Sequence, residues 1–296
     1  MRLISYLTDE GPRAAAVNPD DEVVDLWRAL GTPKPMLRED WHRTPAHPEG
    51  LRAALERYAP DDLIEAAVGG EPLGPVSEVT LLPPITDPQK IICIGLNYGA
   101  HAEEAGQEPP EVPTFFAKFS NALAAPGAEV TLPDASEKVD YEAEVAFVIG
   151  RRGADVDADE ALGHVAGYTL LNDLSARDLQ FQTPQWIPGK VFAGSAPCGP
   201  WLLPTSEAPS ANAIELRLDL NGETMQDSST ADLIHSVPEL VAHLSRVTSL
   251  EVGDIVSTGT PAGVGSVRRP RVWLEDGDEI EVSSPTLGKL RTTIRR

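Results

Sequence analysis

The chain has 296 residues, of which 41% are hydrophobic, and this length and composition allow one large globular domain or two smaller ones. Its 46 acidic and 24 basic residues give a formal net charge of −22, which argues against nucleic acid and anionic membrane surfaces as partners. Only Cys93 and Cys198 are present, and no segment is apolar enough for a signal peptide or a membrane span, so we expect a cytosolic protein without a membrane partner.

Residues 1–72 are predicted to form a small N-terminal α/β domain. A hairpin is expected across the turn-rich cluster 9–12, followed by a short strand at 23–26 and by helices at 51–58 and 61–68, the second with Asp61 or Asp62 as its N-cap. The Gly/Pro-rich stretch 69–75 marks the end of this domain. We therefore expect a linker at 73–84 and a catalytic domain at 85–296.

A continuous apolar run at 90–95 predicts a buried strand, and it leads into a candidate short helix that contains His101 and Glu104. Residues three apart lie on the same face of a helix. A carboxylate beside an imidazole orients its tautomer and raises its basicity, so this pair is a candidate general base. Glu103 competes with Glu104 for the same role, and a plain surface pair is the alternative.

The stretch from Val139 to Ile149 predicts a strand, since β-branched and aromatic residues dominate it. Alternation places Glu142 and Glu144 on one face, roughly 7 Å apart at their Cα atoms. Two buried carboxylates repel each other and lose hydration unless one is protonated or a cation joins them. A hard divalent cation is one solution. An edge strand with a solvated polar face is the alternative, and this stretch alone does not decide between them.

Other polar residues interrupt or follow apolar strands. Lys118 lies within the apolar run 114–119, which predicts either a sheet edge or a nearby anionic site. Asp173 follows the apolar strand 165–171 and is a candidate third carboxylate for a cation at Glu142 and Glu144. Arg177 and Gln180 would follow on the next helical turn as donors to an anion or a carbonyl, and Lys190 lies in a turn.

The remaining segments favour strand over helix. A helix is expected to start within 155–161 and another at 237–244, and Asn221-Gly222 predicts a hairpin turn. The strand at 254–258 runs into a glycine-rich loop at 259–265 that matches neither a Walker loop nor a dinucleotide fingerprint. The predicted fold class is therefore α+β and mostly β.

Several motifs together resemble the fumarylacetoacetate hydrolase family over about residues 85–296. In chain order they are Gly95-Leu96-Asn97-Tyr98 with His101, Asp140-Tyr141-Glu142-Ala143-Glu144, Ile149-Gly150, Gly167-Tyr168, Asn172-Asp173 with Ala176-Arg177-Asp178, Gly189-Lys190, Gly199-Pro200 and Gly259-Thr260-Pro261. Each motif alone is weakly specific, whereas the set in this order is highly specific.

The resemblance implies a β-roll catalytic domain, a small N-terminal domain and, commonly, a homodimer. It implies that Glu142, Glu144 and Asp173 hold Mg²⁺, Mn²⁺ or Ca²⁺, and that His101 with Glu104 activates a water. Substrate contacts or charge neutralisation are expected from Arg177, Gln180, Lys190 and Thr260, and we add Lys118 from its position in an apolar strand. Family members often read Gly-Lys-Ser-Phe-Asp where this chain has Gly189-Lys190-Val191-Phe192-Ala193, so the surroundings of Lys190 are expected to differ.

The favoured hypothesis is a metal-dependent hydrolase that cleaves a C–C bond in a β-diketo acid such as an acylpyruvate. His101 would deprotonate the attacking water, and the leaving group would be a metal-bound enolate neutralised by Lys190. The same enolate would serve a decarboxylase of oxaloacetate-like acids or an isomerase of 2-hydroxydienedioates, which are the alternatives. A further alternative is a metal-binding or assembly protein without catalytic activity. The expected partner is a small 2-oxo or β-diketo acid.

Overall fold

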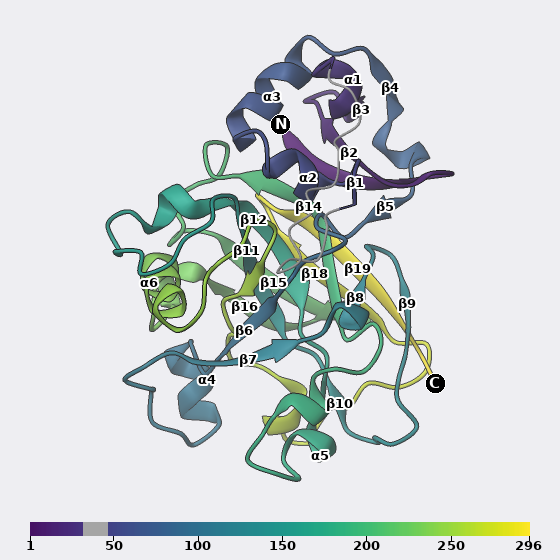
Figure 1. The fold of residues 1–296 in the computed structure, drawn as a ribbon. Coiled ribbons are helices and arrows are strands. Elements are labelled where there is room, and N and C mark those ends of the chain that lie inside the picture. The colour runs from purple at the N-terminus through teal and green to yellow at the C-terminus, as the bar shows by residue number, and fades with distance from the viewer. Residues whose placement is uncertain (32–46) are drawn as a thin grey trace.

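A computed structural model describes residues 1–31 and 47–296. A smaller N-terminal part lies against a larger, strand-rich part (Figure 1). Strands predominate over helices, which confirms the prediction of a mostly β, α+β fold.

A large sheet runs through both parts of the described chain. Its strands are β1 (Arg2–Thr8), β2 (Gly11–Val17), β3 (Glu22–Asp25), β4 (Pro72–Pro75), β5 (Leu81–Leu82), β6 (Ile91–Gly95), β7 (Thr114–Lys118), β8 (Leu123–Ala124), β11 (Ala143–Ile149), β12 (Val165–Asn172), β14 (Ala196–Pro204) and β17 (Ile255–Ser257). The order across the sheet is β4-β3-β2-β1-β14-β12-β11-β17-β6-β7, with β5 beside β1 and β8 beside β14. The β1–β14 pairing joins the N-terminal part to the rest.

Two smaller sheets complete the β structure of the larger part. Their strands are β9 (Glu129–Thr131), β10 (Val139–Asp140), β13 (Ser175–Ala176), β15 (Glu215–Leu220), β16 (Glu223–Ser229), β18 (Glu279–Ser284) and β19 (Gly288–Arg295). One sheet has the order β16-β15-β18-β19-β9, and β10 pairs with β13. A shared core packs the inward faces of β15, β18 and β19 against β11, since Leu218, Val282 and Leu290 belong to one buried cluster with Val145 and Phe147.

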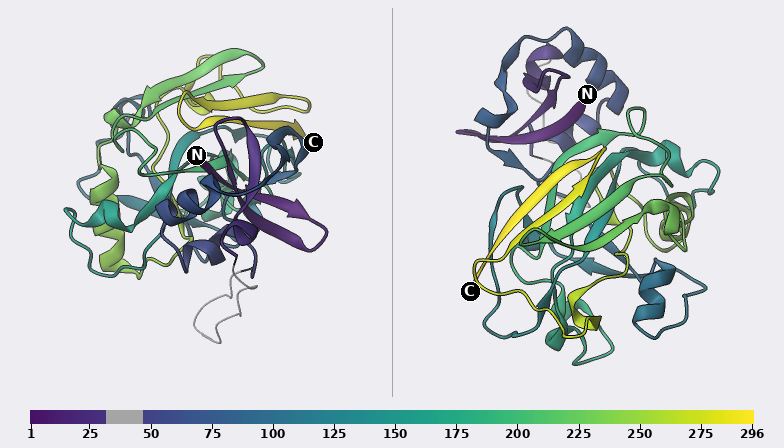
Figure 2. Two further views of the ribbon diagram at one scale, coloured as in Figure 1. Left: turned by 90° about the horizontal axis from the view of Figure 1, so that it is seen from above. Right: turned by 180° about the vertical axis from the view of Figure 1, so that it is seen from behind.

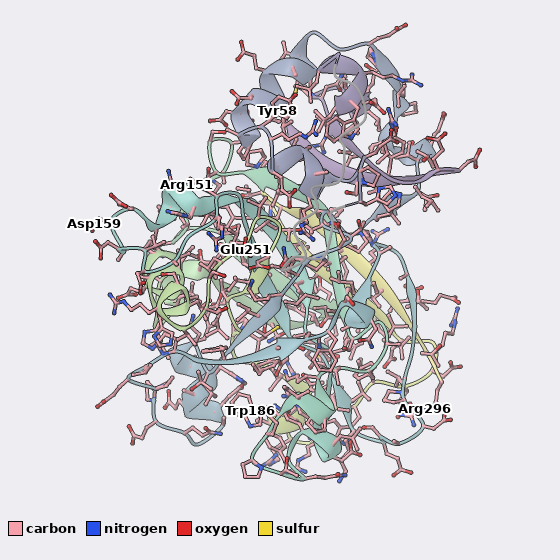
Figure 3. The ribbon with its side chains drawn as sticks, in the orientation of Figure 1. Tyr58, Arg151, Asp159, Trp186, Glu251 and Arg296 are labelled. Atoms are coloured by element: carbon pink, nitrogen blue, oxygen red, sulfur yellow. The ribbon has the colours of Figure 1, made fainter. Side chains whose placement is uncertain are left out.

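Helices are short and lie around the sheets (Figure 2). They are α1 (Leu26–Ala29), α2 (Leu51–Leu55), α3 (Pro60–Val68), α4 (Gly99–Glu104), α5 (Arg177–Gln180) and α6 (Val237–Val247), with 3₁₀ turns at Val76–Glu78, Ser120–Ala122, Ala161–His164, Ile187–Gly189, Thr230–Asp232 and Gly265–Val267. Within the described ranges, none of these helices is long and apolar enough to cross a membrane. Figure 3 shows side chains filling both parts of the molecule, with Arg151 and Glu251 labelled on the side where α6 lies.

The N-terminal hairpin was predicted correctly, but two local details differ. Ala59 is the N-cap of α3 and Pro60 is its first residue, so Asp61 and Asp62 lie inside the first turn instead of capping it. Asp62 accepts a hydrogen bond from the Ala59 N–H, as expected for an acid in a helix's first turn. The predicted break after residue 69 contains β4, which pairs with β3. The domain limits at 72 and 84 remain predictions.

Two further local predictions had opposite outcomes. Asn221 and Gly222 have φ angles of 52° and 82°, as a two-residue hairpin turn requires, and they connect β15 to β16. The helix start expected within 155–161 was wrong. Asp155 has a φ of 51°, its N–H donates to the carbonyl of Ser245, and only a 3₁₀ turn follows at Ala161–His164.

The predicted strand 139–149 is divided into β10 and β11 by Tyr141 and Glu142. Its alternation persists across the break. One face contributes Val139, Tyr141, Ala143, Val145, Phe147 and Ile149 to a single core cluster, and Ala146 and Val148 belong to another cluster. The division occurs because β11 pairs with β12, whereas β10 pairs with β13 beyond the end of β12.

Candidate functional site

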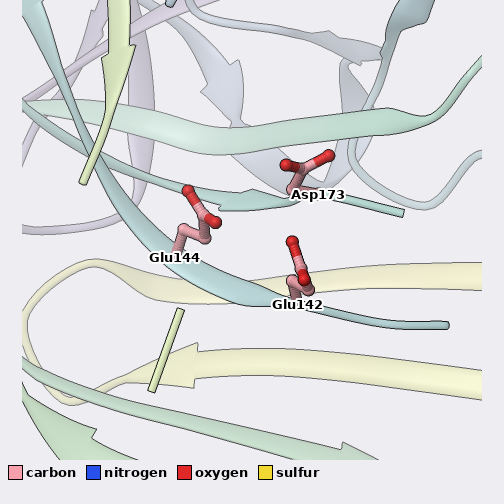
Figure 4. Close-up of side chains that lie close together, drawn as sticks. All are labelled: Glu142, Glu144 and Asp173. Carbon is pink, nitrogen blue, oxygen red and sulfur yellow. The ribbon is translucent and has the colours of Figure 1, made fainter. Parts of the chain in front are cut away.

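Glu142, Glu144 and Asp173 converge where β11 begins and β12 ends. Figure 4 shows their three carboxylates turned toward one another. Carboxylate oxygens, one from each residue, all lie within 4.8 Å of one another, and all three side chains are buried. Because β11 lies between β12 and β17, the solvated edge strand considered for Glu142 and Glu144 is wrong.

Three cationic side chains surround two of these carboxylates. Lys190 Nζ lies 2.6 Å from Glu142 and 2.8 Å from Asp173, and Arg177 lies 2.6 Å from Glu142. Burial opposes ionisation of Glu142, but Arg177 and Lys190 outweigh it and hold the pKa of Glu142 well below its usual range. Glu142 is therefore an anion at neutral pH.

Lys118 pairs with Asp173 and is not among the residues that line the cavity described below. It ends β7, an edge strand of the large sheet, and its Nζ is 2.6 Å from Asp173. Lys118 therefore has both of the features that its sequence pattern predicted as alternatives, a sheet edge and an anionic neighbour. Because its ammonium is fully buried, we propose that it positions Asp173 instead of touching substrate as first predicted.

Glu144 has no ion pair among the described residues. Its carboxylate accepts hydrogen bonds from the Ser257 hydroxyl and, at 3.2 Å, from the Gly259 N–H. Burial, and then repulsion by Asp173 and Glu142, raises the pKa of Glu144 well above its ordinary value. The three carboxylates are buried and offer only oxygen ligands, and Glu144 has no cationic partner among the described residues. Such a ligand set suits a hard divalent cation, so these three residues could hold one.

His101 and Glu104 form the pair predicted on a short helix. Both lie on α4, with His101 Nδ1 2.8 Å from Glu104 Oε1. The neighbouring Glu103 is exposed, and Glu104 also accepts from the Gly263 N–H, which favours Glu104 as the orienting carboxylate. With Nδ1 engaged in this way, Nε2 is the nitrogen available for proton transfer.

A cavity of about 360 Å³ brings these groups together. Among the residues lining it are His101, Glu142, Glu144, Arg177, Gln180, Lys190 and Thr260. Phe116 and Trp186 form part of its apolar wall, and Lys190 Nζ lies 4.9 Å from the centre of the Phe116 ring. The cavity therefore places a candidate base, a carboxylate cluster and a buried ammonium around one space.

The glycine-rich loop at 259–265, which matches neither a Walker loop nor a dinucleotide fingerprint, supports this site. Thr260 donates to the carbonyl of Ala143 at 3.0 Å and accepts from Gln226 at 2.8 Å. The N–H groups of Gly265 and Ser266 donate to Asp140 at 2.7 and 3.0 Å.

Arg177 also binds Asp140, at 2.9 Å, so this carboxylate connects the loop to the cluster. Sequence reasoning missed Asp140 as a supporting residue, although it lies in the motif that contains Glu142. Nothing in the local pattern identified Gln226.

Comparison with known proteins places these features in a family. The family model described as "Fumarylacetoacetate (FAA) hydrolase C-terminal" matches residues 90–295. The oxaloacetate tautomerase FAHD2A, mitochondrial, of Bos taurus is 41% identical over 219 residues, which are 73% of this chain and 70% of that protein.

Solved structures resemble the chain over its whole length. The 5-carboxymethyl-2-hydroxymuconate delta-isomerase of Mycobacterium smegmatis has a TM-score of 0.75 and 32% identity and covers 100% of this chain and 99% of its own. The maleylpyruvate hydrolase of Sphingobium sp. SYK-6 has a TM-score of 0.79 and 26% identity, with the same coverage.

A strand-rich fold that places a His–Glu pair and three buried carboxylates around one cavity defines a small-molecule enzyme whose site could hold a divalent cation. The chain belongs to the fumarylacetoacetate hydrolase family.

Proposed function

We propose that the chain is a divalent-cation-dependent tautomerase or isomerase of 2-oxo acids. Tautomerisation or isomerisation through the same enolate, an alternative hypothesis above, is therefore preferred here to C–C hydrolysis. The observation that carries the proposal is the pairing of a candidate proton acceptor, His101, with a cation-binding carboxylate cluster in one cavity. The names of the bovine tautomerase and the mycobacterial isomerase support it.

Keto–enol interconversion moves one proton between C3 of a 2-oxo acid and its 2-oxo oxygen. His101 Nε2 takes the C3 proton, and the electron pair of the C–H bond forms the C2=C3 double bond while the carbonyl π pair moves to oxygen. Glu104 stabilises the imidazolium that results. Returning a proton to the oxygen completes the enol, and returning one to carbon restores the ketone.

Charge on the 2-oxo oxygen is stabilised by the residues around the carboxylate cluster. Lys190 supplies a buried ammonium, and Arg177 and Gln180 supply N–H donors to the substrate. Thr260 also lines the cavity, but its hydroxyl already donates to the carbonyl of Ala143. When bound at Glu142, Glu144 and Asp173, Mg²⁺ or Mn²⁺, with Ca²⁺ as a third candidate, would act as a Lewis acid on the 2-oxo group.

C–C hydrolysis is the second candidate. It is favoured by the shared fold of the maleylpyruvate hydrolase and by the same His–Glu pair, which could deprotonate a water instead of a C–H bond. Decarboxylation of an oxaloacetate-like acid would use the same charge stabilisation, with carbon dioxide leaving in place of the proton. The homodimer and the cytosolic location also remain predictions, and the name of the bovine relative places that protein in mitochondria.

The proposal is tested by following the loss of enol absorbance of oxaloacetate with EDTA-treated protein, with and without added Mg²⁺. We expect Mg²⁺ to restore turnover, and Glu142→Gln or Asp173→Asn to reduce it by at least about a hundredfold, since each removes a charged ligand. Glu223→Gln, at an exposed position on β16, is the charge-matched control. Full turnover by Glu142→Gln without bound metal would contradict the cation assignment.

A further inference from the structure

The buried side chain of Gln226, on β16, has no part in the reaction described above. It is 1% exposed, although Thr224 and Asp227 on the same strand are exposed. The pairing of β15 with β16 shifts register here, with Met225 as the extra residue, so that Gln226 lies opposite the core residue Leu218. A β-bulge re-aims a side chain, and this one directs Gln226 to the glycine-rich loop.

The amide of Gln226 makes three hydrogen bonds that fix its orientation. Its Oε1 accepts from the Ala143 N–H at 2.9 Å. Its Nε2 donates to the Pro261 carbonyl and to the Thr260 hydroxyl, each at 2.8 Å. A backbone N–H only donates and a backbone carbonyl only accepts, so the position needs an acceptor and a donor on one head group. A glutamine provides both, whereas an ionised glutamate or a methionine of similar length provides no donor.

These bonds form a closed ring around the peptide between the two glutamates of the carboxylate cluster. Strand β17 pairs with β11 only at 146–148, so Ala143 lies beyond its end. Side chains take its place, because Thr260 donates to the Ala143 carbonyl at 3.0 Å and the Ala143 N–H donates to Gln226. Buried hydrogen bonds linked in this way strengthen one another. The ring therefore fixes the backbone from which Glu142 and Glu144 both project.

The same amide also holds the loop that supports the His–Glu pair. Its partner Pro261 lies two residues before Gly263. The Gly263 N–H donates to both carboxylate oxygens of Glu104, at 3.0 and 3.1 Å, and Glu104 lies 2.8 Å from the ring of His101. A Cβ on Gly263 would lie 3.3 Å from Gln226 Cγ, so the loop packs directly against this side chain.

We propose that Gln226 is a positioning residue that sets the geometry of the cation site and of the proton acceptor together. Its Oε1 holds the peptide between Glu142 and Glu144, and its Nε2 holds the loop that supports Glu104. The inference rests on the proposed function, because it takes these two glutamates as cation ligands and His101 as the proton acceptor. Removing a group that orients metal ligands typically costs about ten- to a hundredfold in metal affinity or activity.

Cation affinity tests the role of Oε1 without any turnover. The full chain is treated with EDTA, dialysed and titrated with Mn²⁺, and free Mn²⁺ is measured by electron paramagnetic resonance. Gln226→Met keeps the length of the side chain but removes the amide. We expect it to raise the Kd for Mn²⁺ by about tenfold, because the peptide that carries both glutamates is no longer fixed. Gln226→Asn, a smaller change whose amide is one methylene too short, should weaken binding in the same direction.

Thr230→Val is the control for a plain loss of stability. Thr230 directly follows β16, is 1% exposed and accepts from the Ile214 N–H at 3.0 Å, but it is not among the residues that line the cavity. Urea unfolding should show that Thr230→Val and Gln226→Met are both less stable than the wild type, since each loses a buried hydrogen bond. Only Gln226→Met should lose Mn²⁺ affinity. An equal rise in Kd for Thr230→Val would overturn the positioning role.

Turnover at saturating Mn²⁺ tests the role of Nε2. The substrate is oxaloacetate enol, and the rate with Mn²⁺ alone is subtracted. Gln226→Met should lower kcat by about tenfold even when the cation site is full, because the loop no longer holds Glu104 beside His101. In a Glu104→Gln background the same change should cost less than about twofold, since residues that act through one another are not additive.

The possible failures are distinguishable. Unchanged Mn²⁺ affinity in Gln226→Met, or an unchanged kcat at saturating Mn²⁺, would overturn the joint role of Gln226 while the proposed function stands. If the wild-type protein binds Mn²⁺ but does not convert oxaloacetate enol, the proposed function is contradicted together with the role of Nε2. The affinity measurements then still decide the role of Oε1.

Discussion

The backbone N–H of Gly263 donates to both carboxylate oxygens of Glu104, at 3.0 and 3.1 Å, and so links the glycine-rich loop to the His–Glu pair. Gly263 has a φ of 108°, and a Cβ there would lie 2.2 Å from the carbonyl oxygen of Met225, so only glycine fits. Arg268 donates to the carbonyls of Gly263 and Met225 at 3.0 and 2.6 Å. Arg268 is therefore placed to position Glu104 through Gly263.

Arg268→Gln should lower kcat by about tenfold with little change in KM, because a misplaced Glu104 no longer orients His101. In a Glu104→Gln background the same change should have almost no further effect, because residues that act through one another are not additive. Steady-state kinetics of the two single variants and the double variant measure this. Arg269→Gln, at the exposed neighbouring position, is the control. If Arg268→Gln lowered kcat equally in the wild-type and Glu104→Gln proteins, Arg268 would act independently of Glu104.

Gly95→Ala should raise KM by about tenfold. A Cβ at Gly95 would lie 2.5 Å from the Trp186 ring, which packs edge-on against Phe116 with ring centres 5.9 Å apart. The added methyl group would push Trp186 away from the cavity wall. Trp186→Leu in the same chain should relieve the clash and recover part of the loss. Gly99→Ala is the matched control, since a Cβ there meets nothing within 4 Å. An unchanged KM in Gly95→Ala would show that the position of Trp186 in the cavity wall is not required for substrate binding.

Asp25→Asn should destabilise the protein by about 2 kcal/mol at pH 7, the typical net value of hydrogen bonds to a charged group. Burial opposes ionisation of Asp25, but the Arg13 side chain and the Arg28 N–H outweigh it and lower the pKa of Asp25. A lowered folded-state pKa gives stability that is complete above the unfolded value of about 3.9 and is lost as pH falls through the folded value.

Urea unfolding at pH 7, 5, 4 and 3 measures this effect. The difference between Asp25→Asn and wild type should be constant down to about pH 5 and should shrink below about pH 4. Asp20→Asn, on an exposed turn, should match the wild type at every pH. A difference that stays unchanged at pH 3 would mean that the Asp25 charge is not its source.

Both cysteine thiols should resist alkylation in the folded protein. Burial raises the pKa of Cys198 to about 12 and that of Cys93 well above its ordinary value. Iodoacetamide at pH 8 should therefore label neither thiol within hours, and both within minutes in urea, as read by intact-mass spectrometry. Rapid labelling of the folded chain would contradict the buried positions of β6 and β14.

Alternation is a local property, so the sequence predicted that Glu142 and Glu144 share a face, while the choice of a cation site over a solvated edge came from the family resemblance. Glu142 and Glu144 lie two residues apart in a β-branched stretch, and this alone places them on one face. The break at Tyr141 and Glu142 could not be predicted in the same way. It depends on partners far along the chain, since the Glu142 N–H donates to Asn172 and the Ala143 N–H donates to Gln226.

The choice between Glu103 and Glu104 shows the same limit. Helical spacing favours Glu104 as the neighbour of His101, but Gly263, 159 residues further along the chain, holds it in place. Similarly, an interrupting lysine predicted an anionic site near Lys118 without identifying Asp173 as its partner. Which residue types meet in the cavity was predictable from the sequence, whereas the supporting contacts are long-range and follow only from the fold.

We propose that this site interconverts keto and enol forms with a cation at Glu142, Glu144 and Asp173. The most direct test is proton NMR of EDTA-treated protein in D₂O with an acylpyruvate, before and after addition of Mg²⁺. We predict Mg²⁺-dependent deuterium incorporation at C3 with the carbon skeleton intact. Release of pyruvate and a carboxylic acid as the main products would contradict the tautomerase assignment and establish C–C hydrolysis instead.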